Sequence, residues 1–385
     1  MKMLRNNLGT WFLRFLLLVN VVVDVSLAKE KATCVYTGVY NFGDSNSDTG
    51  GLSAAFLPLP WPHGETFFKK ASGRYSDGRV MLDFFAEKLG IPYLSAYLNS
   101  LGANYSHGTN FATGGSTIRQ PNETIFATSI SPFSLDIQIA QYDQLKSRSK
   151  DLFESDPKIR NMLPKEELFS KALHTFDIGQ NDLAVAIRTI NNDDQIRAEI
   201  PKIIAQLSSA VQHLYKEGGR SFWIHNTGPI GCLPDSTGSI TSPPGTLDKY
   251  GCIKSRNDIA KEFNKQLNDT VSKLRTELPK AAITYVDVYI AKYGLISQAT
   301  SLGWEDPRKL CCGYLEKDGR VWCGRKGLLN NGTVIFGGAC SKPDRYVSWD
   351  GIHYTEAANK WFANQIINGS LSNPPIPITH ACHRH

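Results

Sequence analysis

The sequence has no arginine-rich run and no stripe of alternating basic and aromatic side chains, so we do not expect it to bind nucleic acid. Positive charge is only in slight excess: the formal net charge is +6, and +2 of this lies in the first 28 residues. Internal repeats and low-complexity linkers are also missing, which excludes a solenoid or a chain of tethered modules. What is present, 41% apolar and 20% charged residues, is typical of a globular protein with a large core.

The first 28 residues have the pattern of a secretory signal. Lys2 and Arg5 precede a largely apolar stretch over residues 11–25, and residues 26–28 supply the small side chains that a signal peptidase recognises. The alternative is a retained membrane anchor, but this stretch is short for a hydrocarbon layer of about 30 Å. No later segment is long and apolar enough to span, so we expect no stable membrane insertion. We therefore expect removal of residues 1–28 and a secreted mature protein, located in the extracellular space or the cell wall.

The cysteines and the N-glycosylation sequons are also consistent with a secreted protein. The eight cysteines form an even number and all follow the expected cleavage site, which favours structural disulfides in an oxidising compartment. Their spacing does not match a zinc site, so we expect no metal and no cofactor, and their pairing stays open. The mature chain also contains five sequons, at which we expect glycosylation: Asn104, Asn122, Asn268, Asn331 and Asn368.

Strand and helix patterns alternate along the chain. Strands are expected at residues 36–42, 108–112, 172–178, 221–225 and 282–288. Helices are expected at residues 79–89, 135–149, 194–216, 250–278 and 355–367. This order predicts an α/β fold, with a mainly parallel sheet of roughly five strands between two layers of helices, in a single domain over residues 29–385. Residues 302–344, rich in cysteine and glycine, are expected to form an irregular excursion from that domain.

Polar loops follow the predicted strands. Ligands bind open parallel sheets at the carboxyl ends of the strands. Ser45 follows the first strand, and a histidine oriented by a carboxylate can activate such a serine as a nucleophile. Asp350 and His353 are close enough in sequence for one tight turn to bring them together. The backbone N–H groups of Ser45 and Gly115 and the side-chain amide of Asn181 could bind the oxyanion that forms during attack on an ester.

The same segments resemble a known family, the plant GDSL esterase/lipases, a branch of the SGNH hydrolases. The resemblance covers essentially the whole mature chain and implies a flavodoxin-like α/β/α fold and a serine esterase. It implies that Ser45, Asp350 and His353 form the catalytic triad, and that Gly115 and Asn181 complete the oxyanion hole. The segments that carry the resemblance are Phe42–Gly50 (FGDSNSDTG), Gly73–Arg79 (GRYSDGR), Gly108–Ser116 (GTNFATGGS), Gly179–Asp182 (GQND), Gly228–Pro234 (GPIGCLP) and Trp349–Ala357 (WDGIHYTEA).

Two residues depart from the family pattern. Asn46 stands where the family name has leucine, and Tyr354 stands where many members have proline. Both lie beside catalytic positions without replacing them, and they make the chain similar to the early-nodulin-8-like members. That subgroup includes proteins described as acetylesterases on sugars and one described as an α-fucosidase. The expected substrates are therefore acetyl esters of carbohydrates, or lipid or other short-chain esters, carried on a small molecule or a polysaccharide.

Two other functions remain open at this point. A glycoside hydrolase of the α-fucosidase kind needs two carboxylates beside the sugar bond, for which Asp44, Asp48 and Asp350 are the candidates. A secreted binding protein with an inactive site is the other alternative, although the catalytic set is complete. Asp48 and Asp182 are expected to cap turns or helices behind the site. Nothing in the sequence indicates an oligomeric state.

Overall fold

Six strands form one sheet in the computed structural model, which describes residues 33–121, 131–238 and 245–383. The strands are β1 (Val39–Gly43), β2 (Gly108–Asn110), β3 (Leu173–Asp177), β4 (Ser221–His225), β5 (Ala282–Val286) and β10 (Ser372–Asn373). Their spatial order is β10-β5-β4-β3-β1-β2, and only β10 runs antiparallel. The five expected parallel strands are thus present, and a two-residue edge strand is added to them.

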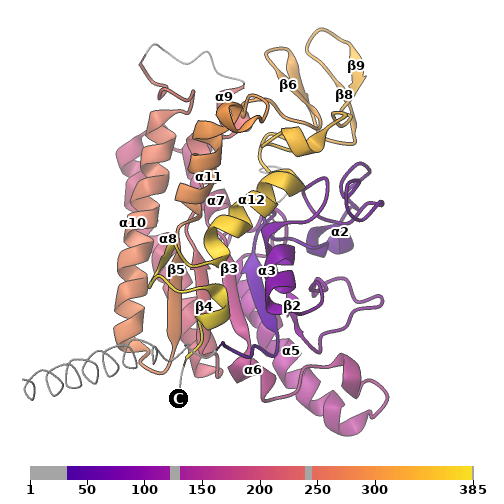
Figure 1. Ribbon diagram of the computed structural model, residues 1–385, viewed down its shortest axis with the longest axis vertical. Coiled ribbons are helices and arrows are strands. Elements are labelled where there is room, and N and C mark those ends of the chain that lie inside the picture. The colour runs from indigo at the N-terminus through magenta and orange to yellow at the C-terminus, as the bar shows by residue number, and fades with distance from the viewer. Residues whose placement is uncertain (1–32, 122–130, 239–244, 384–385) are drawn as a thin grey trace, which may run out of the picture. The chain divides into compact units, whose positions relative to one another are not determined.

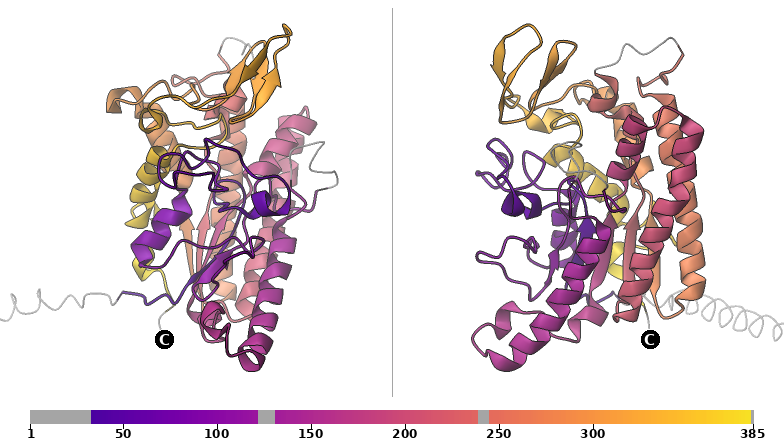
Figure 2. Two further views of the ribbon diagram at one scale, coloured as in Figure 1. Left: turned by 90° about the vertical axis from the view of Figure 1, so that its right-hand side faces the viewer. Right: turned by 180° about the vertical axis from the view of Figure 1, so that it is seen from behind.

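Helices cover both faces of this sheet, so the fold is the expected three-layer α/β/α sandwich (Figure 2). One layer contains α5 (Leu135–Ser155), α8 (Asp193–Lys216) and α10 (Lys254–Glu277). The other contains α3 (Met81–Leu89), α11 (Val288–Gln298) and α12 (Glu356–Ile367). The other α-helices of the described residues are α2 (Gly51–Ala55), α6 (Leu168–Lys171), α7 (Gln180–Thr189) and α9 (Pro234–Thr237).

The two helical layers explain the composition of the central strands. Every residue of β1, β3 and β4 is buried, because side chains on both sides of the sheet meet a helix. Tyr40 and Phe42 of β1 and Phe176 of β3 form a stacked aromatic group there together with Phe111. The core therefore lies on both faces of the sheet, and the polar residues that follow the strands are left at its edge.

Local signals in the sequence set several helix boundaries. The Asn192 side chain accepts a hydrogen bond from Gln195 N at 3.0 Å and begins α8. Thr355 begins α12 in the same way, through a 3.2 Å bond from Ala358 N. Gly90 ends α3 with φ at 69°, a left-handed conformation that favours glycine. Thr355 matters most for the site, because it fixes the helix that starts three residues after His353.

The cysteine-rich excursion contains two hairpins, at the top of Figure 1. One joins β6 (Tyr314–Glu316) to β7 (Gly319–Val321), and the other joins β8 (Lys326–Leu328) to β9 (Val334–Phe336). The segment is therefore more regular than the sequence indicated. Disulfides Cys311–Cys340 and Cys312–Cys323 hold it, and Cys232–Cys252 closes another loop. No cysteine of the described residues is free.

The N-terminal region can be described only in part. The expected signal, residues 1–28, and the sequon at Asn122 lie outside the described residues. Residues from Val35 onward form one compact unit. Among the residues that the structure describes, no helix has both the length and the apolar character needed to cross a membrane.

Candidate active site

The polar loops meet at one edge of the sheet, where the parallel strands end. β1 lies between β2 and β3, so the segments that follow these three strands are neighbours. Asp44 N donates to Asp177 O at 3.1 Å, which joins the turn after β1 to the end of β3. The Asn181 side chain, in the first turn of α7, donates to Ser116 O at 2.9 Å. These bonds bring the segments around Ser45, Gly115 and Asn181 together.

Asp350 and His353 form a close pair in the tight turn before α12. His353 Nδ1 lies 2.6 Å from Asp350 Oδ2, and Asp350 Oδ1 accepts hydrogen bonds from His353 N at 2.8 Å and Ile352 N at 3.0 Å. Gly351 makes the turn possible with φ at 97°. Burial would raise the pKa of Asp350, but the charge and hydrogen bonds of His353 outweigh it and hold that pKa well below the ordinary value. An ionised carboxylate on Nδ1 leaves Nε2 as the proton-accepting atom.

Ser45 occupies the turn directly after β1 and is 6% exposed. Within the described residues, the buried Nε2 atom of His353 makes no hydrogen bond. The Ser45 hydroxyl and His353 Nε2 are therefore not bonded to each other. Hydrogen bonds of a nucleophile and its base are often long until substrate is bound, so this separation is compatible with their pairing in the reaction.

Three N–H donors lie near this turn. In the described structure, no hydrogen bond is made by the backbone N–H of Ser45 or by that of Gly115. The Asn181 amide uses one of its two hydrogens on Ser116 O, which leaves the other free. Gly115 has φ at 80°, a conformation that a residue with a side chain rarely adopts. These are the donors that the sequence predicted, and an oxyanion is the kind of group they would bind.

Asp48 carries out the capping role expected of it. Its carboxylate accepts hydrogen bonds from the backbone N–H groups of Gly50, Gly51 and Leu52 at 2.6–3.1 Å, and from Gly114 N at 2.8 Å. Burial raises the pKa of Asp48, and these four N–H donors oppose the rise. This one side chain therefore ties the segment after Ser45 to the residue before Gly115.

Asp182 supports the opposite side of the site. It accepts from Ile118 N at 2.8 Å and from Arg119 N at 3.1 Å, and burial raises its pKa to about 6. Since Asp182 follows Asn181 in α7, it fixes this helix to the loop that carries Gly115. Asp182 was expected to cap a turn or helix behind the site, and the backbone N–H groups that it accepts belong to a loop and not to a helix end.

A buried charged cluster beside the turn that carries Ser45 was not predicted. It consists of Asp44, Asp177, His225 and Lys292, which is only 2% exposed. His225 Nδ1 lies 3.6 Å from Asp177 Oδ2, and a small polar cavity touches Asp44, Asp177 and Lys292. Burial, reinforced by the charge of Asp177, raises the pKa of Asp44. Burial opposes ionisation of Asp177 as well, but His225 and Lys292 lower its pKa. One signal was available: Lys292 is the single charged residue of α11.

Both departures from the family pattern lie against this charged cluster. Asn46 donates to Asp44 Oδ1 twice, from its backbone N–H at 2.9 Å and from its side chain at 3.0 Å. A leucine would keep the first bond and lose the second. The ammonium of Lys292 lies 4.8 Å from the centroid of the Tyr354 ring, which also packs on Phe362. Asn46 and Tyr354 thus contribute to the surroundings of Asp44 and Lys292.

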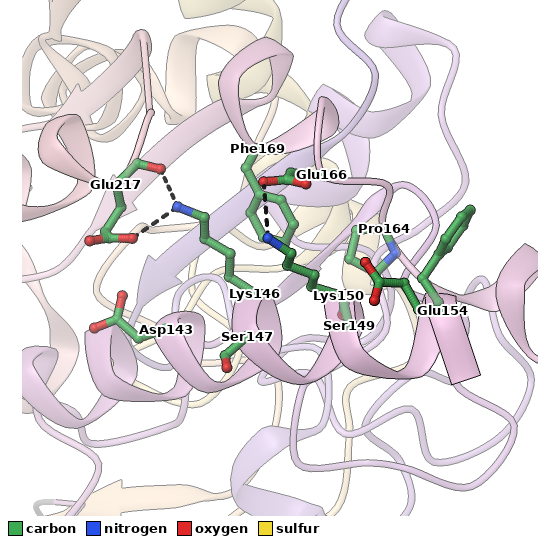
Figure 3. A pocket seen from close by; sticks show the side chains of 11 residues that line it. Asp143, Lys146, Ser147, Ser149, Lys150, Glu154, Pro164, Glu166, Phe169 and Glu217 are labelled. Carbon is green, nitrogen blue, oxygen red and sulfur yellow. Dashed lines mark hydrogen bonds and ion pairs between the residues drawn. The ribbon is translucent and has the colours of Figure 1, made fainter. Parts of the chain in front are cut away.

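Two other features contribute no reacting group to the candidate chemistry. His63 is a buried packing histidine, 6.0 Å from the Trp349 ring and bonded through Nδ1 to Pro60 O at 2.8 Å. The other feature is a pocket along α5 (Figure 3), whose two lysines are paired with glutamates. The pairs are Lys146–Glu217 at 2.9 Å and Lys150–Glu166 at 3.9 Å. None of the predicted site residues lines this pocket.

Comparison with known proteins points to one family. The model of the GDSL-like lipase/acylhydrolase family matches residues 39–366. A GDSL esterase/lipase of Arabidopsis thaliana is 56% identical over 99% of this chain and 97% of its own length. The GDSL esterase/lipase ENOD8 of Medicago truncatula is 44% identical over 91% of each chain. Alpha-L-fucosidase 3 of Arabidopsis thaliana is 46% identical over 87% of this chain and 91% of its own.

Proposed function

Because this chain belongs to the plant GDSL esterase/lipase family and is a carboxylic ester hydrolase, we propose that Ser45 is its nucleophile. His353 Nε2 takes the Ser45 proton as the hydroxyl attacks the ester carbonyl, and Asp350 holds the imidazole in the required tautomer. The 2.6 Å contact between His353 Nδ1 and Asp350 Oδ2 supports this assignment most directly.

The negative oxygen of the tetrahedral intermediate is bound by the N–H groups of Ser45 and Gly115 and by the Asn181 amide. Collapse of the intermediate breaks the bond to the alcohol, which leaves with the proton held by His353. The acyl group stays on Ser45 as an ester. His353 then activates a water molecule, and its attack releases the acid and restores the serine.

Replacing the nucleophile tests the mechanism. For Ser45→Ala we expect kcat/KM on a short p-nitrophenyl ester to fall at least about 10⁴-fold, because the variant lacks the oxygen that takes the acyl group. The variant should also resist labelling by a fluorophosphonate that labels the wild type. Full activity, or labelling at the same rate, would show that Ser45 is not the nucleophile.

We further propose that the substrate is an acetyl ester of a carbohydrate or a lipid or other short-chain ester. Acetylated sugars, acetylated xylan and triglycerides of increasing chain length, assayed side by side, separate these classes. The relative named Alpha-L-fucosidase 3 makes glycoside hydrolysis the second candidate. Against it, the Asp44 and Asp350 carboxylates are both buried and already accept hydrogen bonds from neighbouring residues. Release of fucose by Ser45→Ala at the wild-type rate would favour that candidate.

Secretion and glycosylation form the last part of the proposal. Residues 1–28 act as the signal, and residues 29–385 form the mature, single-domain enzyme in the extracellular space or cell wall. Of the sequons in the described residues, Asn104, Asn331 and Asn368 are exposed, whereas Asn268 is half-buried on α10. Mass spectrometry of the secreted protein should find an N-terminus at Lys29 and glycans on the three exposed asparagines.

A further inference from the structure

Tyr75 spans the space between the proposed base and the loop that carries Gly115. Its ring centroid is 4.6 Å from that of His353, with the ring planes tilted by 35°. The other end of the phenol reaches Gly114. A Cβ atom placed on Gly114 would stand 2.6 Å from the Tyr75 hydroxyl, so only glycine lets the phenol approach this closely. Tyr75 therefore touches both sides of the site that would surround a bound ester.

The chain holds the segment of Tyr75 firmly from both directions. Before it, Arg74 makes a buried two-point ion pair with Asp83 of α3, at 2.8 and 2.7 Å. After it, Asp77 accepts a hydrogen bond from Glu356 N at 2.7 Å, in the first turn of α12. Since α12 begins just after His353, the positions of the Tyr75 ring and the imidazole are set by the same helix end.

The Tyr75 hydroxyl is a donor without an acceptor in the described structure. Burial, together with the nearby carboxylates of Asp48 and Asp350, raises the pKa of Tyr75, so the phenol keeps its proton. Tyr75 is half-buried, so its hydroxyl is free to bond with a ligand that enters the site. The hydroxyl lies beside Gly114, in the loop that carries Gly115, where an ester would supply acceptor oxygens.

We infer that the Tyr75 hydroxyl donates a hydrogen bond to an oxygen of the bound ester group, while its ring holds the His353 imidazole in place. This inference rests on the proposed function, because it takes Ser45 as the atom that receives the acyl group. It adds a fourth protein donor to the three N–H groups. It also gives a reason for the glycine at position 114, which precedes the oxyanion glycine.

The variant that removes only the oxygen is Tyr75→Phe. We expect kcat/KM on an alkyl ester to fall by about 10- to 100-fold, mainly through kcat, as for loss of one hydrogen bond that strengthens in the transition state. The melting temperature and the pH dependence of kcat/KM should stay at wild-type values, because the ring is retained. Tyr105→Phe is the matched control, since it loses a bond to Tyr97 O away from the site and should keep full activity.

Tyr75→Leu then tests the ring. It should lower kcat/KM further than Tyr75→Phe and shift the acid limb of the pH–rate profile, because the imidazole loses its neighbour. A Tyr75→Phe enzyme with wild-type kcat/KM overturns the hydroxyl contact, and a Tyr75→Leu enzyme that equals Tyr75→Phe overturns the role of the ring. Neither result affects the assignment of Ser45, which fails only if Ser45→Ala remains active.

Discussion

At the scale of single residues, Asp350 offers the sharpest test of the acid–base pair. Asp350→Asn keeps the shape of the side chain but removes the charge and favours the wrong imidazole tautomer, so kcat should fall about 10⁴-fold. A second, surface Asp–His pair supplies the control: Asp143 lies 2.9 Å from His213 Nε2, away from the polar loops. Ester hydrolysis by Asp143→Asn should match the wild type. Equal losses in the two variants would contradict a special role for Asp350.

The depressed pKa of Asp350 also predicts how stability depends on pH. The group is ionised more readily in the folded chain than in the unfolded chain, where its pKa is near 3.8. Its contribution to stability is therefore complete above that value and is lost as the pH falls through the lower, folded value. The melting temperature of the wild type should exceed that of Asp350→Asn most at neutral pH, and the gap should shrink below about pH 4. A difference in melting temperature that stays constant down to pH 2.5 would contradict the lowered pKa of Asp350 in the folded chain.

Some residues of the candidate site could be predicted from the sequence and others could not, for a physical reason. Ser45, Gly115 and Asn181 each follow a strand, so their meeting at one sheet edge follows from the parallel order. Tyr75 follows no strand. Its segment, Gly73–Arg79, carries part of the family resemblance, but the contact that holds it beside His353 comes from Glu356, far away in the sequence, and no local pattern reveals such a contact. For the same reason the partners of Lys292 could not be read from α11 alone.

At the scale of elements, α11 brings a buried charge to the turn after β1. Lys292→Met keeps a long side chain but removes the buried cation whose charge acts on Asp177 and Asp44. Leaving a buried charge without compensation typically costs about 3–5 kcal/mol. Urea unfolding should show a loss of that order. Lys261→Met, on the exposed side of α10, should change the free energy of unfolding by less than about 0.5 kcal/mol. Adding Asp44→Asn to Lys292→Met should recover part of the loss, and no recovery would show that Asp44 does not interact with Lys292.

Helices and strands were predicted correctly where the hydrophobic periodicity was strong, and some were missed where burial on all sides removes that periodicity. The strand at residues 221–225 was predicted to the residue, and the long amphipathic helices were found. Helix α11 was missed because it follows β5 almost directly and is apolar nearly all round, which removes the 3.6-residue pattern. Helix α7 was missed because its first residues form the GQND segment, which has the composition of a loop. Strand β10 is too short to show any alternation.

At the scale of the whole molecule, the site is assembled from pieces that are far apart in the chain. Residues 43–50, 73–79 and 113–119 come from the N-terminal third, whereas residues 350–356 lie near the C-terminus. The excursion adds a further connection, since an Arg320 guanidinium N–H donates to Asp350 O at 3.3 Å. Cys312 N also donates to Trp349 O at 2.6 Å. The hairpins therefore brace the turn that carries Asp350 and His353.

This bracing predicts that a disulfide outside the catalytic set affects both stability and rate. Replacing Cys312 and Cys323 with alanine opens a loop with a sequence separation of 11. Loss of so short a crosslink should lower the free energy of unfolding by about 2–3 kcal/mol. Because Cys323 Sγ lies 4.0 Å from the ring of His63, which packs on Trp349, the turn before α12 should loosen as well.

The expected consequence for catalysis is a fall in kcat/KM of about 10-fold at a temperature where the variant is fully folded, since small displacements of an acid–base pair are costly. Asn192→Ala separates this effect from general destabilisation. It removes the cap of α8, should cost about 1 kcal/mol, and lies away from the site. If that variant loses as much activity as the double cysteine variant, stability alone explains the loss. If only the cysteine variant slows, the hairpins position the Asp350–His353 turn.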